Sequence, residues 1–236
     1  MHIFETFDRA HNCLRFLIKE YNIREMYLPY YLCDVIRHTL FEEDCKPIFY
    51  HIDDNFMPAI EFPQESYVLY PNYFGILGEN VKKLGSTYPK LIVDNAHAFF
   101  DLPSGFACFN SGAKFGFGDI AYLWVRKFPF HNMPEAQNIT SSHLNIKQKC
   151  RNRFMELHKT YSGINCLNIR LNEDMAPFCY PLLIESAEKA DKIVEELISQ
   201  GLTIYRYWNP LPKSYNEYKF YSRLVPIPVA EILSSP

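Results

Sequence analysis

The stretch from residue 91 to residue 127 constrains the fold more than any other part of the chain. It begins with a short apolar run, residues 91–93, that contains β-branched side chains. This composition is typical of a strand buried on both faces of a sheet. The run ends at Asp94, and open α/β sheets bind ligands at the carboxyl ends of their strands. Asp94 is therefore a candidate ligand-binding residue.

A second apolar run, residues 120–125, is followed by Arg126 and Lys127. We expect this run to form a strand, so that the acid at one strand end and the amine at the other face the same crevice. Pyridoxal phosphate (PLP) chemistry uses such a pair, because a lysine forms the Schiff base and a carboxylate keeps the pyridine nitrogen protonated. Solvated Asp and Lys side chains are also common at strand ends, so the spacing alone leaves both interpretations open.

Predicted strands and helices alternate along the first half of the chain. The strands are expected at residues 26–28, 48–52 and 67–70, and the helices at residues 8–21, 35–40 and 80–84. Asp8 is placed to cap the first helix. Strands that alternate with helices predict an α/β fold with a mainly parallel sheet, helices on its flanks and right-handed crossovers.

The second half of the chain predicts a smaller α+β domain behind a polar, turn-rich linker. We divide the chain into a large domain over residues 1–135 and, over residues 136–236, a connecting helix with the small domain. The expected elements of the second part are a helix at 143–158, a strand at 178–184, a helix between a Ser186 cap and a Gly201 stop, and a strand at 202–205.

Charge and cysteine usage exclude several classes of protein. The net charge is −3, which supplies no basic surface for nucleic acid or a membrane. Seven cysteines are scattered without a C-x-x-C pair, which favours free thiols in a reducing cytoplasm over a disulfide framework. No apolar run approaches the roughly 20 residues of a membrane span, and charged residues among the first 20 argue against a signal peptide. We expect a cytoplasmic protein.

Five motifs occur in an order that resembles the DegT/StrS family of sugar aminotransferases, which are PLP enzymes of fold type I. They are LPYYLC (28–33), IFYHID (48–53), VLYPNYFG (68–75), IVDNAHAFF (92–100) and GDIAYLWVRK (118–127). The resemblance runs from about residue 8 to about residue 228. It implies the large PLP-type α/β domain, the small C-terminal α+β domain and a homodimer.

The resemblance also implies roles for particular residues. In the family's D-x-x-H motif, Asp94 would hold the pyridine nitrogen and His97 would lie near the phenolic oxygen of PLP. Lys127 maps onto the Schiff-base lysine, and Trp124 stands where the family has a serine that binds the cofactor phosphate. Lys114 is the rival lysine, ranked lower because no predicted strand precedes it.

Three further residues are candidates for contacts with the cofactor. Tyr31 or Cys33 would lie against the pyridine ring, although an aromatic or a thiol after a strand is as often a core residue. Asn72 would hydrogen-bond cofactor or substrate, with a turn-forming role as the alternative. Asp94, His97 and Asp101 are also the best available metal ligands, but they lack the clustering typical of a zinc site, and we expect no metal.

The function implied by the resemblance is amino transfer from an amino acid to a keto sugar, nucleotide-linked, in the biosynthesis of surface polysaccharide. The expected partners are these small molecules and a second copy of the chain, with no nucleic acid and no membrane. The alternative is a non-catalytic relative that keeps the fold and binds a sugar or a protein.

Overall fold

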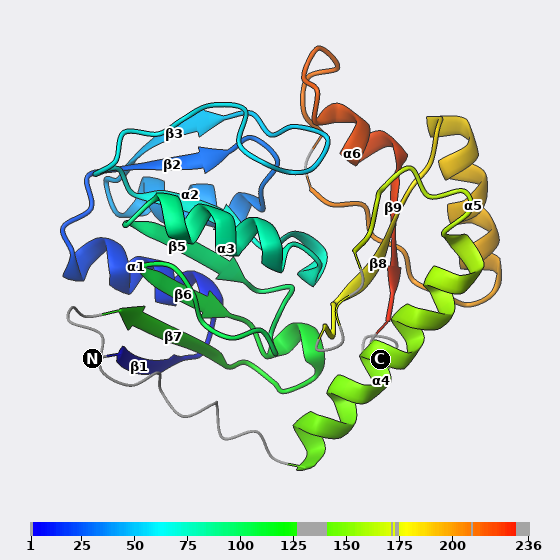
Figure 1. The fold of residues 1–236 in the computed structure, drawn as a ribbon, viewed down its shortest axis with the longest axis horizontal. Helices are drawn as coiled ribbons and strands as arrows, with labels where there is room; N and C mark the ends of the chain where they lie inside the picture. The colour runs from blue at the N-terminus through cyan, green and yellow to red at the C-terminus, as the bar shows by residue number, and fades with distance from the viewer. Residues whose placement is uncertain (1, 127–140, 171, 173–174, 209, 230–236) are drawn as a thin grey trace.

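The computed structural model describes residues 2–126, 141–170, 172, 175–208 and 210–229. They form a large unit built on a seven-stranded sheet and a small unit built on a two-stranded sheet (Figure 1). The expected boundary between residues 135 and 136 lies outside the described residues. In the described part of the chain, no helix is long and apolar enough to cross a membrane.

The large sheet has the strand order β1-β7-β6-β5-β4-β2-β3. Its strands are β1 (His2–Phe7), β2 (Glu25–Pro29), β3 (Lys46–Tyr50), β4 (Val68–Pro71), β5 (Leu91–Asn95), β6 (Ala107–Asn110) and β7 (Ala121–Arg126). The neighbours from β3 to β6 pair in parallel, whereas β7 pairs antiparallel with both β6 and β1. The predicted mainly parallel sheet is confirmed.

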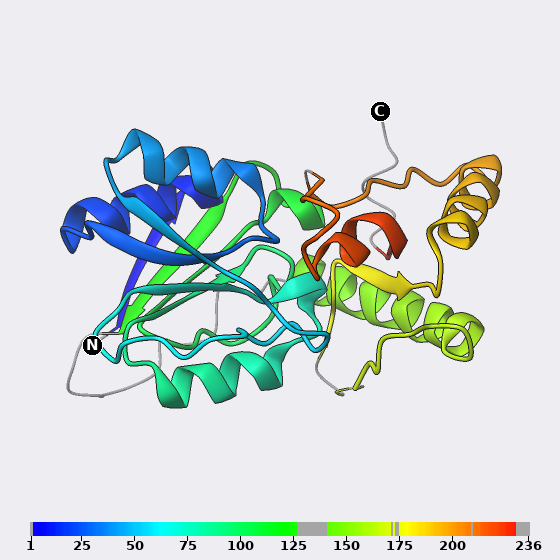
Figure 2. The ribbon, with the colours of Figure 1, turned by 90° about the horizontal axis from the view of Figure 1, so that it is seen from above.

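Helices cover both faces of this sheet (Figure 2). On one face, α1 (Ala10–Glu20) and α2 (Asp34–Glu42) form a buried core with the side of β5 that carries Ile92. On the other face, α3 (Gly78–Thr87) packs against the side that contains Val93. The apolar run of β5 is thus buried on both faces, as its composition predicts.

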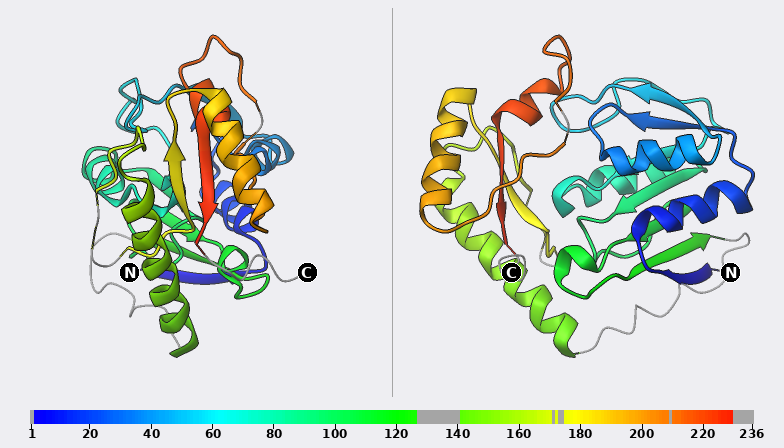
Figure 3. Two further views of the ribbon diagram at one scale, coloured as in Figure 1. Left: turned by 90° about the vertical axis from the view of Figure 1, so that its right-hand side faces the viewer. Right: turned by 180° about the vertical axis from the view of Figure 1, so that it is seen from behind.

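The small unit places α4 (Ser141–Tyr161) and α5 (Ala187–Ser199) beside an antiparallel pair, β8 (Cys179–Leu183) and β9 (Leu224–Pro228) (Figure 3). The short α6 (Tyr218–Arg223) leads into β9. Ser186 Oγ accepts a hydrogen bond from Lys189 N at 3.3 Å, and Gly201 follows α5 with φ +88°. Both predicted ends of this helix are confirmed.

Two local predictions are wrong. Residues 202–205 form no strand; β9 pairs with β8 instead, and its two prolines hid it, because proline is unusual inside a strand. Asp8 does not cap α1, since the N-cap residue is Arg9, and the Asp8 carboxylate accepts a hydrogen bond from the Asn12 side chain at 2.6 Å.

Candidate functional site

The two edges of the large sheet differ in which strands end there. We call the edge where β5 and β6 end the carboxyl edge, and the opposite one the amino edge. Because β7 is antiparallel, it begins at the carboxyl edge and ends at the amino edge. Val125 pairs with Ala107 at the start of β6, and Arg126 pairs with His2 at the start of β1. The expectation that the end of β7 opens on the same crevice as Asp94 is therefore wrong for Arg126, and Lys127 lies outside the described residues.

A different lysine stands at the carboxyl edge. Lys114 belongs to a single 3-10 turn, η2 (Ala113–Phe115), that begins two residues after the end of β6. Gly112 N donates to Ile120 O at 2.7 Å, and a Cβ on Gly112 would lie 2.5 Å from the Ile120 side chain, so a glycine is required at this close approach. β6 was missed in the sequence because its four residues, ACFN, are too few to show a strand pattern.

Asp94 is the second-last residue of β5, and it is partly exposed at the carboxyl edge. Its Oδ1 accepts a hydrogen bond from Ala96 N at 2.9 Å, which is a local turn within its own segment. Burial raises its pKa to about 6, against the opposing effects of that hydrogen bond and of the positive charge of Lys114. In the described part of the chain no Lys or Arg forms an ion pair with it.

His97 is buried three residues later and is neutral. Burial, with the positive charge of Lys114, holds its pKa well below the usual range. Its Nδ1 accepts a hydrogen bond from Phe74 N at 3.3 Å, which places the imidazole proton on Nε2. The side chain can therefore donate one hydrogen bond from Nε2 and carries no charge.

The turn after β4 is fitted closely to His97. Phe74 has φ 59°, a left-handed conformation that is uncommon for a bulky residue, and it is completely buried. A Cβ on Gly75, at φ +77°, would lie 2.3 Å from the carbonyl oxygen of His97. Strained backbone and an obligatory glycine at one position indicate that this turn is over-determined by its surroundings.

Asn72 holds the same turn in place. Its Nδ2 donates to Asn95 Oδ1 at 3.2 Å and to Asp101 Oδ2 at 2.9 Å, and its Oδ1 accepts from Leu77 N at 2.9 Å. Both donors of the amide are engaged within the protein, so Asn72 has a structural role here. Among the described residues no group of three His, Cys, Asp or Glu side chains could hold a metal, and the carboxylate of Asp101 serves Asn72 instead.

Aromatic rings surround the imidazole of His97. Three rings lie within about 30° of parallel to it, with centroid distances of 5.0 Å for Phe178, 5.8 Å for Trp208 and 6.0 Å for Phe74. The Tyr207 ring lies 5.5 Å away. Sequence reasoning missed these contacts because Phe178, Tyr207 and Trp208 belong to the small unit. Lys114 Nζ lies 5.1 Å from the centroid of the Phe178 ring.

Two other candidates lie beside this group. Tyr31 is buried, and its hydroxyl donates to the Tyr207 carbonyl oxygen at 2.7 Å, while its ring meets Trp208 edge-on at 4.7 Å. Cys33 is the N-cap residue of α2 and is partly exposed. Burial raises the pKa of the Cys33 thiol, and the Asp94 charge raises it slightly further, whereas a hydrogen bond from the Val35 backbone and the charge of Lys114 lower it. The structure thus brings Asp94, His97 and Cys33 close enough to Lys114 for its positive charge to lower the pKa of each.

Trp124 is remote from this group. It lies in the middle of β7 opposite Cys108, with 3% of its surface exposed, and its side chain belongs to the core on the α3 face of the sheet. It therefore fills the core and occupies no position at the carboxyl edge.

The first turn of α1 also opens at the carboxyl edge, because β1 runs parallel to β5 and β6 and ends there. No side chain caps the helix from Arg9, whose guanidinium instead binds Asp119 at 2.7 Å. Uncapped N–H groups at a helix start carry partial positive charge and favour a phosphate or another anion.

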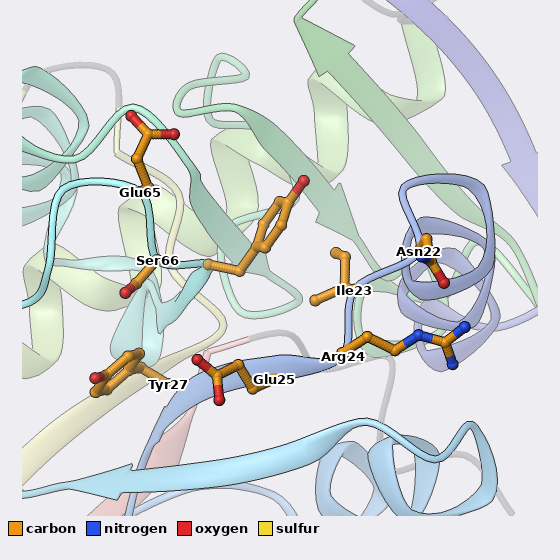
Figure 4. Close-up of a pocket in the computed structure, with 8 residues that line it drawn as sticks. Asn22, Ile23, Arg24, Glu25, Tyr27, Glu65 and Ser66 are labelled. Carbon is orange, nitrogen blue, oxygen red and sulfur yellow. The ribbon is translucent and has the colours of Figure 1, made fainter.

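A surface pocket lies at the amino edge of the sheet, opposite the edge that carries Asp94 (Figure 4). It is lined by Asn22, Ile23, Arg24, Glu25, Tyr27, Glu65, Ser66 and Tyr67. These residues surround the beginnings of β2 and β4, so the pocket lies at the amino edge and includes none of the predicted site residues.

Comparison with known proteins shows the fold. No family model matches the sequence, and no curated protein is similar to it in sequence. Among solved structures, a DegT/DnrJ/EryC1/StrS aminotransferase from Brucella abortus is similar with a TM-score of 0.71 and 12% identity, covering 96% of this chain and 80% of that one. The aminotransferase PseC of Helicobacter pylori, involved in the biosynthesis of pseudoaminic acid, gives a TM-score of 0.69 and 14% identity over 95% and 81% of the two chains.

A Streptococcus pneumoniae protein solved in its PLP form is similar with a TM-score of 0.70 and 14% identity, over 96% of this chain and 82% of that one. The predicted PLP fold type I architecture is confirmed by these similarities. The resemblance seen in the five sequence motifs is confirmed at the level of the fold.

Proposed function

We propose that this protein is a PLP-dependent enzyme that transfers an amino group from an amino acid to a sugar-type acceptor. The observation that carries the proposal is the half-buried carboxylate of Asp94, which forms no ion pair with a described Lys or Arg, although the charge of Lys114 acts on it at the carboxyl edge. A carboxylate kept in such surroundings is expected where a cationic group of a ligand will pair with it.

The residues at this edge fit the parts of the cofactor. Asp94 would pair with the protonated pyridine nitrogen, because a positive ring nitrogen restores the ionised form that burial disfavours. His97 would donate from Nε2 to the phenolic oxygen and orient the ring. The uncapped start of α1 would receive the phosphate. PLP, when bound, supplies an electron sink for the bond that breaks at the amino donor.

Lys114 is the lysine that we assign to the cofactor. It follows β6, the parallel neighbour of β5, and its charge acts on both Asp94 and His97. It would bind the cofactor covalently and, once released by the amino donor, move a proton between donor and cofactor. Lys127 remains the rival, but the strand before it ends at the amino edge.

The substrate assignment draws on the structural neighbours. An aminotransferase of pseudoaminic acid biosynthesis has this fold, which supports a sugar-type acceptor here. Amino transfer to a nucleotide-linked keto sugar for surface polysaccharide is the finer proposal. All seven cysteines are free thiols, which supports a reducing cytoplasm. A homodimer is proposed because two-fold dimers are the commonest soluble assembly.

A second candidate function is binding without catalysis. The Trp208 ring, stacked 5.8 Å from His97, favours it, because this ring occupies space beside a residue that the cofactor would need. In that case the carboxyl edge would be a scaffold, and the protein would bind a sugar or a protein partner.

Covalent trapping separates these possibilities. The protein is incubated with PLP, reduced with borohydride, digested and mapped by mass spectrometry. We expect the label on Lys114; Lys114→Ala should lose it, and Lys127→Ala should retain it. Label on Lys127 would overturn the assignment of the lysine, and absence of label from all three proteins at saturating PLP would favour the binding role. Amino transfer from glutamate to keto-sugar nucleotides then tests the acceptor.

A further inference from the structure

Tyr207 and Trp208 are held to the rest of the protein by few backbone contacts. Residues 202–207 belong to no helix or strand. In the described part of the chain, no N–H of residues 203–208 donates to another backbone carbonyl. A segment without backbone hydrogen bonds opens at low cost compared with a strand or helix.

Two adjacent residues, Arg206 and Tyr207, attach this segment to different units. Arg206 ties it to the small unit, because its Nη1 donates to Ser222 O at 2.9 Å and its Nη2 binds Asp191. Tyr31 ties it to the large unit through the 2.7 Å hydrogen bond from its hydroxyl to Tyr207 O. The segment can therefore leave the large unit while Arg206 keeps it attached to the small one.

The three parallel ring neighbours of His97 are not equally anchored. Phe74 is completely buried within the turn after β4, and Phe178 is buried beside β8. Trp208 is only partly buried, as is Tyr207. A ligand ring that approaches His97 must displace one of these groups. Trp208 is the most exposed of the three and the one that lies in the segment without backbone hydrogen bonds.

We propose that Tyr207 and Trp208 form an aromatic lid over His97, clasped by the Tyr31 hydroxyl, that opens to admit PLP. This inference rests on the proposed function for the identity of the ligand. In the closed position the Trp208 indole lies 13° from the plane of the His97 imidazole and shields it. Opening breaks the hydrogen bond from Tyr31 and moves the indole into solvent.

The tryptophan content makes the lid directly observable. The chain has two tryptophans, so Trp124→Phe leaves Trp208 as the sole reporter. In this background, quenching of fluorescence by acrylamide is measured without PLP. Tyr31→Phe removes the clasp and should increase the accessibility of Trp208 about fivefold, the effect of one net hydrogen bond. If Trp124→Phe does not fold, the Trp208 signal is obtained as the difference between the wild type and Trp208→Phe.

Tyr50→Phe is the matched control. Tyr50 is as buried as Tyr31, and its hydroxyl also donates to a backbone carbonyl, that of Leu69 at 2.9 Å. Among the described residues its ring contacts Phe62, and no hydrogen bond or ring contact joins it to Tyr207 or Trp208. This variant should leave Trp208 quenching unchanged. Equal quenching in the Tyr31→Phe and Tyr50→Phe proteins would overturn the clasp and with it the lid.

PLP provides the second arm. Binding should expose Trp208 to acrylamide, and Tyr31→Phe should accelerate PLP association about fivefold relative to Tyr50→Phe. If PLP labels the protein while Trp208 stays protected, Trp208 is a fixed wall and the lid is refuted, although the proposed function stands. If PLP binds none of the variants, the proposed function and the opening for PLP both fail. Binding only after Tyr31→Phe would support the lid.

Discussion

The carboxyl edge and the amino edge of the large sheet both carry charged residues at strand ends, but only one resembles a reaction site. At the carboxyl edge, Asp94 and Lys114 stand within electrostatic reach of each other, and no described Lys or Arg forms an ion pair with the carboxylate. At the amino edge, Glu65 pairs with Lys90 at 3.0 Å in an exposed position. Strand direction, rather than the type of residue at a strand end, therefore decides where a site can form.

The largest effect is expected when each of the two candidate lysines, Lys114 and Lys127, is replaced by alanine. Lys114→Ala should reduce amino transfer by at least about 1,000-fold, because both covalent attachment and proton transfer are lost. Lys127→Ala should retain most activity. Steady-state rates at saturating PLP measure both. If only Lys127→Ala lost most of its activity, Lys127 rather than Lys114 would be the lysine that binds the cofactor.

The close fit of the turn after β4 predicts a large effect on stability. Gly75→Ala should lower the free energy of unfolding by about 3 kcal/mol, because the new Cβ would lie 2.3 Å from the His97 carbonyl oxygen at a φ of +77°. Gly201→Ala has a similar φ of +88° but nothing within 4 Å, and should cost about 1 kcal/mol. Urea unfolding compares the two variants; equal losses would show that the turn is not tightly fitted.

The raised pKa of Asp94 predicts that replacing this residue increases the stability of the fold, by an amount that depends on pH. Burial raises this pKa to about 6, from 3.8, so the folded protein binds the proton more tightly than the unfolded chain. Stability of the cofactor-free protein therefore falls as pH rises from about 4 to about 6. Asp94→Asn should stabilise it by about 2 kcal/mol at pH 8 and by almost nothing at pH 3.

Urea unfolding at the two pH values, without PLP, tests this expectation. Asp54→Asn is a control, because Asp54 is an exposed partner of Lys219 and its pKa is lowered by hydrogen bonds from Lys219 and Asn216. Its removal should not stabilise the protein at pH 8. A pH-independent effect of Asp94→Asn would mean that the carboxyl is not held in a desolvated position.

The smallest effect is expected at the amino edge. Glu65→Gln removes an ion pair in which the Glu65 side chain is 80% exposed, and such pairs contribute less than about 1 kcal/mol. The unfolding free energy should change by less than about 0.5 kcal/mol, and PLP labelling should be unchanged. Lost labelling in this variant would place function at the amino edge after all.

The sequence by itself determined the elements with strong local patterns. The apolar run before Asp94, the Ser186 cap and the Gly201 stop form as expected, because each depends on residues only a few positions apart. The motif order also indicated the fold, which the solved structures confirm. Asp94 and His97 could be proposed from the sequence because Asp94 lies at the end of β5 and His97 lies just after it.

Only the tertiary structure decided the direction of β7, and with it the choice of lysine. An apolar run is the same whether its neighbour is parallel or antiparallel, so its composition does not specify direction. The ten residues between β6 and β7, which contain no α-helix, are too few for the usual crossover between parallel strands, but this signal requires that β6 be recognised first.

The aromatic surroundings of His97 also required the folded chain. Phe178, Tyr207 and Trp208 follow His97 by more than 80 positions in the sequence, and packing of the small unit against the carboxyl edge brings them to it. Such contacts depend on how two units pack together, which hydrophobic periodicity does not encode. The residues that would receive a cofactor are thus legible in the sequence, whereas the rings that cover them are a product of tertiary packing.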